Sequence, residues 1–143
     1  MSSTVDVHGA RPPRVDVILT AHLLLAGAFV VVVAAYLGRM VSAGVGPAGM
    51  VTGQYDPKDM VPFGMSGANP FFWLYAAVSL LYLFGFILGP AVALYTGAVL
   101  ARERQRYSVR ARRLLLAAMV GTLVLTVLRF TPALGSMQRW WLD

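Results

Sequence analysis

A cluster of arginines constrains this chain more than any other feature of its sequence. Between Leu100 and Leu114 there are six arginines and one acid, Glu103, and a long apolar run lies on either side. Arginines at this density do not partition into hydrocarbon, whereas the flanking runs are apolar enough to do so. The positive-inside rule therefore predicts a chain that crosses a membrane and leaves this segment at the cytoplasmic face. The six arginines are Arg102, Arg104, Arg106, Arg110, Arg112 and Arg113.

The composition supports a membrane location. Of the 143 residues, 58% are apolar and only 13% are charged, against about a quarter charged in soluble proteins. After subtraction of the loops, the length accommodates about three spans of roughly 20 residues each. We therefore expect one all-α membrane domain over residues 15–143 and no separate catalytic domain.

The charge indicates lipid as a partner. A net charge of +6 suggests nucleic acid in a soluble protein, but half of the twelve basic residues lie in one segment beside the bilayer. Anionic headgroups are therefore the expected partner of the arginines, and nucleic acid is not. The eleven arginines against one lysine, with abundant alanine, glycine and valine, are typical of a high-GC bacterium. The expected location is its plasma membrane.

The chain divides into three predicted spans and their connections. Residues 1–14 are polar and predict a flexible cytoplasmic tail. The spans are expected at about 15–38, 71–100 and 114–133, joined by an external loop (41–69) and a basic cytoplasmic loop (101–113). This arrangement puts the N-terminus in the cytoplasm and the C-terminus outside. It also puts Trp73, Trp140 and Trp141 at the outer interface as headgroup-level anchors.

The second span is too long to cross a bilayer as a straight helix. This apolar run is 30 residues long and would reach about 45 Å at 1.5 Å per residue. Gly89 and Pro90 predict a kink, because Pro90 has no N–H to bond the carbonyl of Phe86 and clashes with it.

Small residues recur every four positions along this span, at Gly85, Gly89, Ala93 and Gly97. Such a stripe allows two helices to approach closely, which is a main source of helix association in lipid. We expect it to pack against the other spans of the same chain, with a seam for another subunit as the alternative. Ala34 and Gly38 form a shorter version in the first span.

Two ionisable side chains lie within or near the predicted spans. His22 is an intramembrane histidine, which makes an axial haem ligand, a proton relay or a quinone contact possible roles. The favoured interpretation is a neutral ring bonded to a neighbouring helix through the hydroxyl of Thr122 or Thr126. A haem would need a second ligand from another chain, and no cofactor is otherwise indicated. Arg129 is expected to snorkel outward from the end of the third span.

The sequence carries no motif of soluble catalysis. A phosphate loop, a dinucleotide fingerprint and the HExxH and GxSxG motifs are absent, and no metal site is predicted. The leading hypothesis is a small noncatalytic integral subunit or accessory protein that packs into a larger membrane complex through the stripe from Gly85 to Gly97. The alternatives are a homo-oligomeric pore, carrier or holin-like protein, and a haem- or quinone-associated membrane anchor subunit that uses His22.

Overall fold

The structure, a computed structural model, describes residues 15–142, and every regular element in this range is helical. The expected cytoplasmic tail 1–14 lies outside the described residues. The elements are α1 (Val15–Ala43), α2 (Pro47–Met50), the 3₁₀ turn η1 (Pro57–Met60), α3 (Pro70–Glu103), the 3₁₀ turn η2 (Arg104–Arg106), α4 (Val109–Leu128) and α5 (Pro132–Leu142). Three of them, α1, α3 and α4, are long and apolar enough to cross a membrane. The all-α class and the three candidate spans are therefore confirmed.

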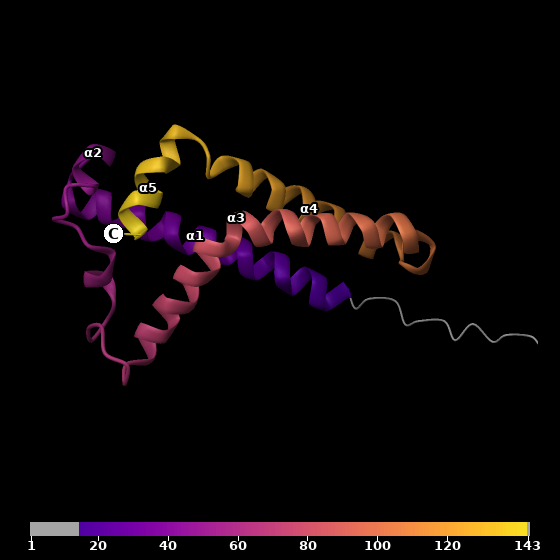
Figure 1. The fold of residues 1–143 in the computed structure, drawn as a ribbon, viewed down its shortest axis with the longest axis horizontal. Coiled ribbons are helices and arrows are strands. Elements are labelled where there is room, and N and C mark those ends of the chain that lie inside the picture. Colours follow the sequence, from indigo (N-terminus) through magenta and orange to yellow (C-terminus); the bar gives the residue numbers. More distant parts are fainter. Residues whose placement is uncertain (1–14, 143) are drawn as a thin grey trace, which may run out of the picture.

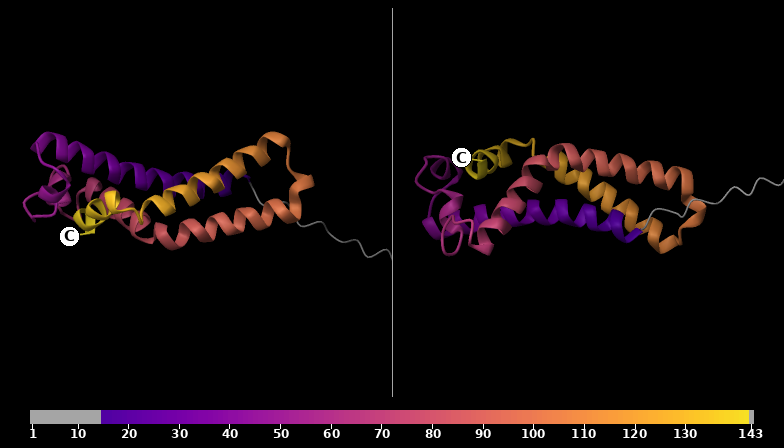
Figure 2. Two further views of the ribbon diagram at one scale, coloured as in Figure 1. Left: turned by 90° about the horizontal axis from the view of Figure 1, so that it is seen from above. Right: turned by 60° about the horizontal axis from the view of Figure 1, so that its bottom comes forward.

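The three long helices form an elongated bundle in which each contacts the other two. The beginning of α1 lies at the same end of the bundle as the η2 turn that joins α3 to α4 (Figure 1). Both views in Figure 2 place α2, α5 and the α1–α3 connection together at the opposite end. The molecule thus has an arginine-rich end and a capped end.

The helices begin and end at different residues from those expected. Helix α1 continues to Ala43, and α4 covers 109–128 where a span at 114–133 was expected. The reason at the start of α4 is a cap, because the Ser108 hydroxyl accepts a hydrogen bond from the Ala111 N–H at 3.2 Å. Hydropathy marks only the part of a helix that suits hydrocarbon, whereas the helix itself extends to its cap. Arg110, Arg112 and Arg113 accordingly lie in the first turns of α4 and not in a loop.

Helix α3 is bent near its middle (Figure 1). Pro90 lies inside this 34-residue helix, and a proline there removes one backbone hydrogen bond and crowds the preceding turn. The bend turns the first half of α3, which follows the α1–α3 connection, away from α4 (Figure 1).

One side chain ties the external loop to the start of α3. Asn69 accepts a hydrogen bond from the Phe71 N–H at 3.0 Å, which caps the helix. Its amide nitrogen donates to the carbonyls of Pro62 at 2.6 Å and Gly64 at 2.7 Å. Gly64 has a φ of 81°, a left-handed conformation that glycine adopts without strain. The loop is thereby held against the helix that it precedes.

The C-terminal segment forms a helix that the sequence interpretation did not include. Helix α5 packs its apolar face onto α1 and the loop, with Met137 and Trp140 buried at 0% and 2% exposure. Trp140 donates its indole N–H to the carbonyl of Tyr55, and its ring lies 5.3 Å from that of Tyr36. Helix α5 therefore closes this end of the bundle.

The three tryptophans divide into two environments. Trp73 is 62% exposed, whereas Trp141 is only 6% exposed and its ring lies 5.1 Å from that of Tyr75 in a tilted arrangement. Trp140 and Trp141 are thus both packed against protein. The expected anchor role assumes tryptophans on the outer surface of a span. The chain instead turns before Pro132, and this turn directs both rings inward.

Candidate functional site: the seam between α3 and α4

The small residues of α3 face α4 of the same chain. A Cβ atom added to Gly89 would lie 2.7 Å from the Thr126 hydroxyl oxygen, and one added to Gly97 would lie 3.5 Å from the Met119 sulfur. Ala93, between these glycines, is 2% exposed. The later glycine of α3 faces the earlier residue of α4, so the two helices are antiparallel. The stripe is therefore occupied within the chain and is not the surface that would contact another subunit.

His22 connects α1 to this seam. Its ring is 2% exposed, with Nδ1 2.6 Å from the Thr122 hydroxyl and Nε2 2.9 Å from the Thr96 hydroxyl. The Thr96 hydroxyl donates its proton to the Val92 carbonyl at 2.8 Å, so it accepts from an N–H at Nε2. Nδ1 then accepts from Thr122. This assignment satisfies both nitrogens of a neutral imidazole.

These contacts join three helices through one side chain. Thr122 is one of the two hydroxyls expected from the sequence, and Thr96 is an additional partner. A metal or haem iron binds an imidazole through a free ring lone pair, and in this geometry the Nδ1 lone pair accepts the Thr122 proton. The nearby Thr126 hydroxyl donates to the Thr122 carbonyl at 2.8 Å. The hydroxyls of the seam are thus used in contacts between and within helices.

Arg129 follows the last residue of α4 and reaches across to α3. It donates from Nη1 to the Tyr82 carbonyl, and its Cζ lies 4.3 Å from the Tyr82 ring centre and 5.5 Å from that of Phe29. Rings at these distances attract a guanidinium through their quadrupoles. A Cβ on Gly85 would lie 2.7 Å from Nη2, so the glycine provides the space for the cation. The expected outward snorkelling is therefore wrong, because the side chain extends onto α3.

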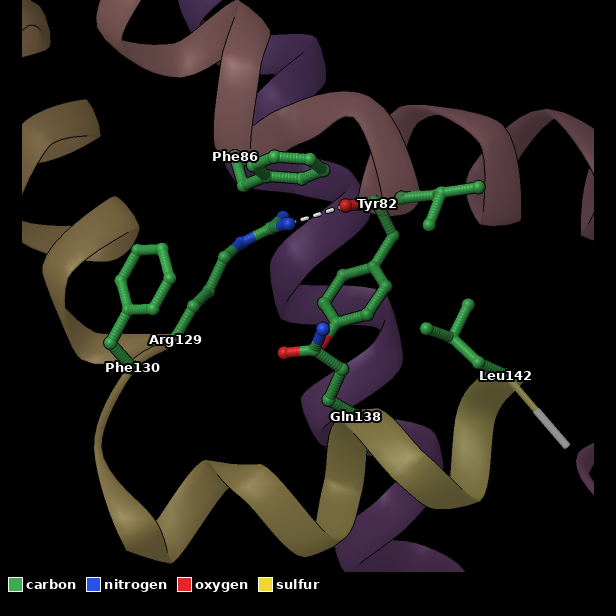
Figure 3. A pocket seen from close by; sticks show the side chains of 7 residues that line it. Tyr82, Phe86, Arg129, Phe130, Gln138 and Leu142 are labelled. Carbon is green, nitrogen blue, oxygen red and sulfur yellow. Dashed lines mark hydrogen bonds between the residues drawn. The ribbon is translucent and has the colours of Figure 1, made fainter.

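A pocket of about 170 Å³ lies beside this guanidinium. Figure 3 shows Arg129 pointing at the Tyr82 carbonyl, with Phe86 and Phe130 on one side and Gln138 of α5 on the other. The pocket thus combines one cation and one amide with walls that are otherwise largely apolar or aromatic. Its lining residues are Tyr82, Leu83, Phe86, Arg129, Phe130, Gln138 and Leu142.

The predicted basic segment lies at the other end of the bundle. Five of its six arginines are exposed and Arg112 is half-buried. Arg104, Arg112 and Arg113 line a shallow pocket of about 360 Å³ together with Leu100, Val109 and Leu116. Arg106 lies 3.8 Å from Glu103. The arrangement presents several guanidinium groups next to apolar helix surface.

Three residues of the seam were not predicted from the sequence: Thr96, Tyr82 and Phe29. Thr96 could have been found, because it lies seven residues after Gly89 and therefore on the same face of α3. The contact of Arg129 with Tyr82 depends on where α4 ends, which hydropathy did not locate. Within residues 15–142, no group of three histidine, cysteine or acidic side chains is placed to hold a metal ion.

Comparisons of the chain with protein-family models, with curated proteins and with solved structures found no match.

Proposed function

We propose that this chain is a small noncatalytic integral membrane subunit that packs into a larger membrane complex through the outer face of α1. The observation that carries the proposal is a second set of small residues that faces away from the bundle. Gly27, Ala34 and Gly38 of α1 are all exposed. A Cβ atom added at Gly27 or Gly38 would meet nothing within 4 Å. A helix of another subunit can approach closely along this face.

The use of polar groups supports a noncatalytic role. The His22 ring and the hydroxyls of Thr96 and Thr122 are engaged in hydrogen bonds that join the helices. A general acid or base must instead reach a substrate from a cavity. The polar groups at this depth stabilise the bundle, which is what a subunit needs in order to present its outer faces.

The outer surface of α4 is suited to contact with lipid, which leaves the outer face of α1 as the proposed surface for a partner. Its outward residues include Leu116, Val120, Val124 and Val127, which are 51%, 49%, 51% and 67% exposed. Their spacing of four, four and three residues puts them on one helical face. Among the helices of residues 15–142, α3 and α1 make the main contacts with the opposite side, so most of the apolar surface of α4 is available to lipid.

The proposed orientation has the N-terminus in the cytoplasm and the C-terminus outside, in the plasma membrane of a bacterium. The arginines of the η2 end are the support, because cytoplasmic ends of spans carry an excess of arginine. The start of α1 lies at that same end (Figure 1), which is consistent with three crossings. Anionic headgroups of the inner leaflet are the proposed partners of this end.

The test is a pull-down of the tagged protein from its native membrane in mild detergent, followed by mass spectrometry and an absorbance spectrum of the same sample. The proposal predicts stoichiometric membrane subunits. Their yield should fall at least about tenfold for the double variant Ala34→Leu/Gly38→Leu, since a seam this tight excludes leucine. The matched control is Gly121→Leu, on α4, where an added Cβ also meets nothing within 4 Å.

The other outcomes distinguish the alternatives. Recovery as a colourless oligomer of this chain alone would favour the pore, carrier or holin-like hypothesis. A Soret band in the purified sample would favour a haem-associated anchor that uses His22. Recovery of an isolated monomer from the native membrane would contradict the subunit proposal.

A further inference from the structure

We infer that the Arg129 pocket binds the phosphate of an anionic phospholipid, with the acyl chains of the lipid lying along the neighbouring apolar surface. The inference concerns the capped end of the bundle and is independent of the subunit role proposed above. Four properties of the site support it: an uncompensated charge, spare hydrogen-bond donors, a position at a membrane interface and apolar walls.

The first property is the charge of Arg129. The guanidinium is half-buried, and no carboxylate within residues 15–142 lies at ion-pair distance from it. Its contacts are the Tyr82 carbonyl and the rings of Tyr82 and Phe29. Carbonyls and rings stabilise a cation without neutralising it, and a charge withdrawn from water favours a counter-ion.

The second property is the number of donors that are free. A guanidinium carries five N–H groups in a planar fork that matches phosphate oxygens. Among the described residues only the Tyr82 carbonyl accepts from Arg129. Gln138, which also lines the pocket, carries a further amide. The site can therefore donate several hydrogen bonds to one anionic group.

The third property is the position along the membrane normal. The uncharged part of α4, residues 114–128, has 15 residues, which corresponds to about 22 Å of a hydrocarbon core about 30 Å thick. Arg112 and Arg113 before this stretch mark one interface, and Arg129 directly after it lies within about 10 Å of the other. Lipid phosphates lie at that interface, so a headgroup is the anion within closest reach of the long Arg129 side chain.

The fourth property is the apolar wall. Leu83 and Phe86 on α3 are 38% and 44% exposed, and Phe130 is 74% exposed. The pocket of about 170 Å³ accommodates part of a headgroup and not a whole lipid. The exposed side chains beside it offer a surface for the acyl chains. An amphiphile with an anionic head fits this combination better than a free ion does.

The test is a lipid titration of the full-length protein in detergent, followed by native mass spectrometry. The probes are dioleoyl phosphatidylglycerol, dioleoyl phosphatidylcholine and inorganic phosphate. We expect the anionic lipid to bind most tightly, and Arg129→Gln to weaken its tightest binding event about tenfold, as expected for loss of a charge-assisted pair. Arg139→Gln is the matched control, because it removes the same charge from an exposed position of α5 that does not line the pocket.

Two further variants separate this site from other effects. Leu83→Trp fills the pocket and leaves the contact of Arg129 with Tyr82 in place, so it should also weaken lipid binding. This variant tests the site even if Arg129→Gln does not fold. Arg104→Gln with Arg113→Gln removes charge from the opposite end and should leave the Arg129-dependent binding event intact.

The outcomes decide between the sources of the phosphate. Equal binding by the wild type, Arg129→Gln and Leu83→Trp would overturn the inference. Equal affinity for both lipids would overturn it as well, because the anionic charge would then not be recognised. Displacement of the lipid by millimolar inorganic phosphate would assign the site to a free anion and overturn its assignment to a lipid.

Discussion

The two stripes of small residues, on α3 and on α1, look alike in the sequence and differ in their surroundings. Gly85 and Gly89 on α3 face Arg129 and Thr126 so closely that an added methyl group would force the facing side chain to shift. Gly38 on α1 faces open space. The difference teaches that spacing alone identifies a surface for close approach, whereas the residues opposite decide whether the chain itself fills it. The α3 stripe provides room for polar and charged side chains that hold the bundle together.

The largest expected effect is on the filled stripe. Gly89→Leu puts a branched side chain where a Cβ alone would lie 2.7 Å from the Thr126 oxygen. The helices must then separate, which we expect to lower the free energy of unfolding by about 3 kcal/mol. The measurement is unfolding in mixed micelles followed by circular dichroism. Gly121→Leu is the control, and an equal loss there would show that the α3 stripe is not specifically filled.

The next effect concerns the polar link to α1. His22→Leu removes hydrogen bonds to Thr96 and Thr122 and should lower the free energy of unfolding by about 2 kcal/mol, since hydroxyls then lack partners. A double-mutant cycle with Thr122→Val should give a coupling of about 1 kcal/mol. A coupling of zero would show that the two side chains do not interact.

A smaller effect is expected at the capped end, which lies outside both stripes. Trp140→Phe keeps an aromatic ring but loses the donor to the Tyr55 carbonyl, at a cost of about 1 kcal/mol. The cost should appear as faster proteolysis after α4, since α5 is then held less firmly. Unchanged cleavage relative to the wild type would mean that this hydrogen bond does not hold α5.

The smallest effect on stability is expected at the open stripe. Gly38→Leu points into open space and should change the free energy of unfolding of the isolated chain by less than about 0.5 kcal/mol. A loss as large as that of Gly89→Leu would remove the distinction between the two stripes.

The sequence predicted the parts of this structure that depend on the chemistry of individual residues in the long apolar helices. The three spans follow from apolar runs, and the bond from His22 to Thr122 follows because few polar side chains lie within the spans. The bend of α3 follows from Pro90 in the middle of a long apolar run.

The parts that depend on where a helix ends and the chain turns could not be predicted from hydropathy. Helix α5 arises because α4 ends at Leu128 and the chain turns before Pro132. Hydropathy does not register that turn, so Arg129 was expected to snorkel outward and Trp140 to face the headgroups. The contacts of both residues follow from where the helix stops, which is set by local hydrogen bonds and not by composition.

Disulfide cross-linking across the filled stripe tests most directly whether α3 packs against α4 of the same chain. The chain contains no cysteine, so Gly89→Cys and Thr126→Cys introduce the only two thiols. The Thr126 oxygen lies 2.7 Å from a Cβ at position 89, so the two Cβ atoms lie within about 4 Å, a separation that a disulfide spans. Packing of α3 against α4 of the same chain predicts a fast disulfide within the monomer when native membranes are oxidised. A disulfide-linked dimer, or no reaction, would contradict the packing of α3 against α4 of the same chain.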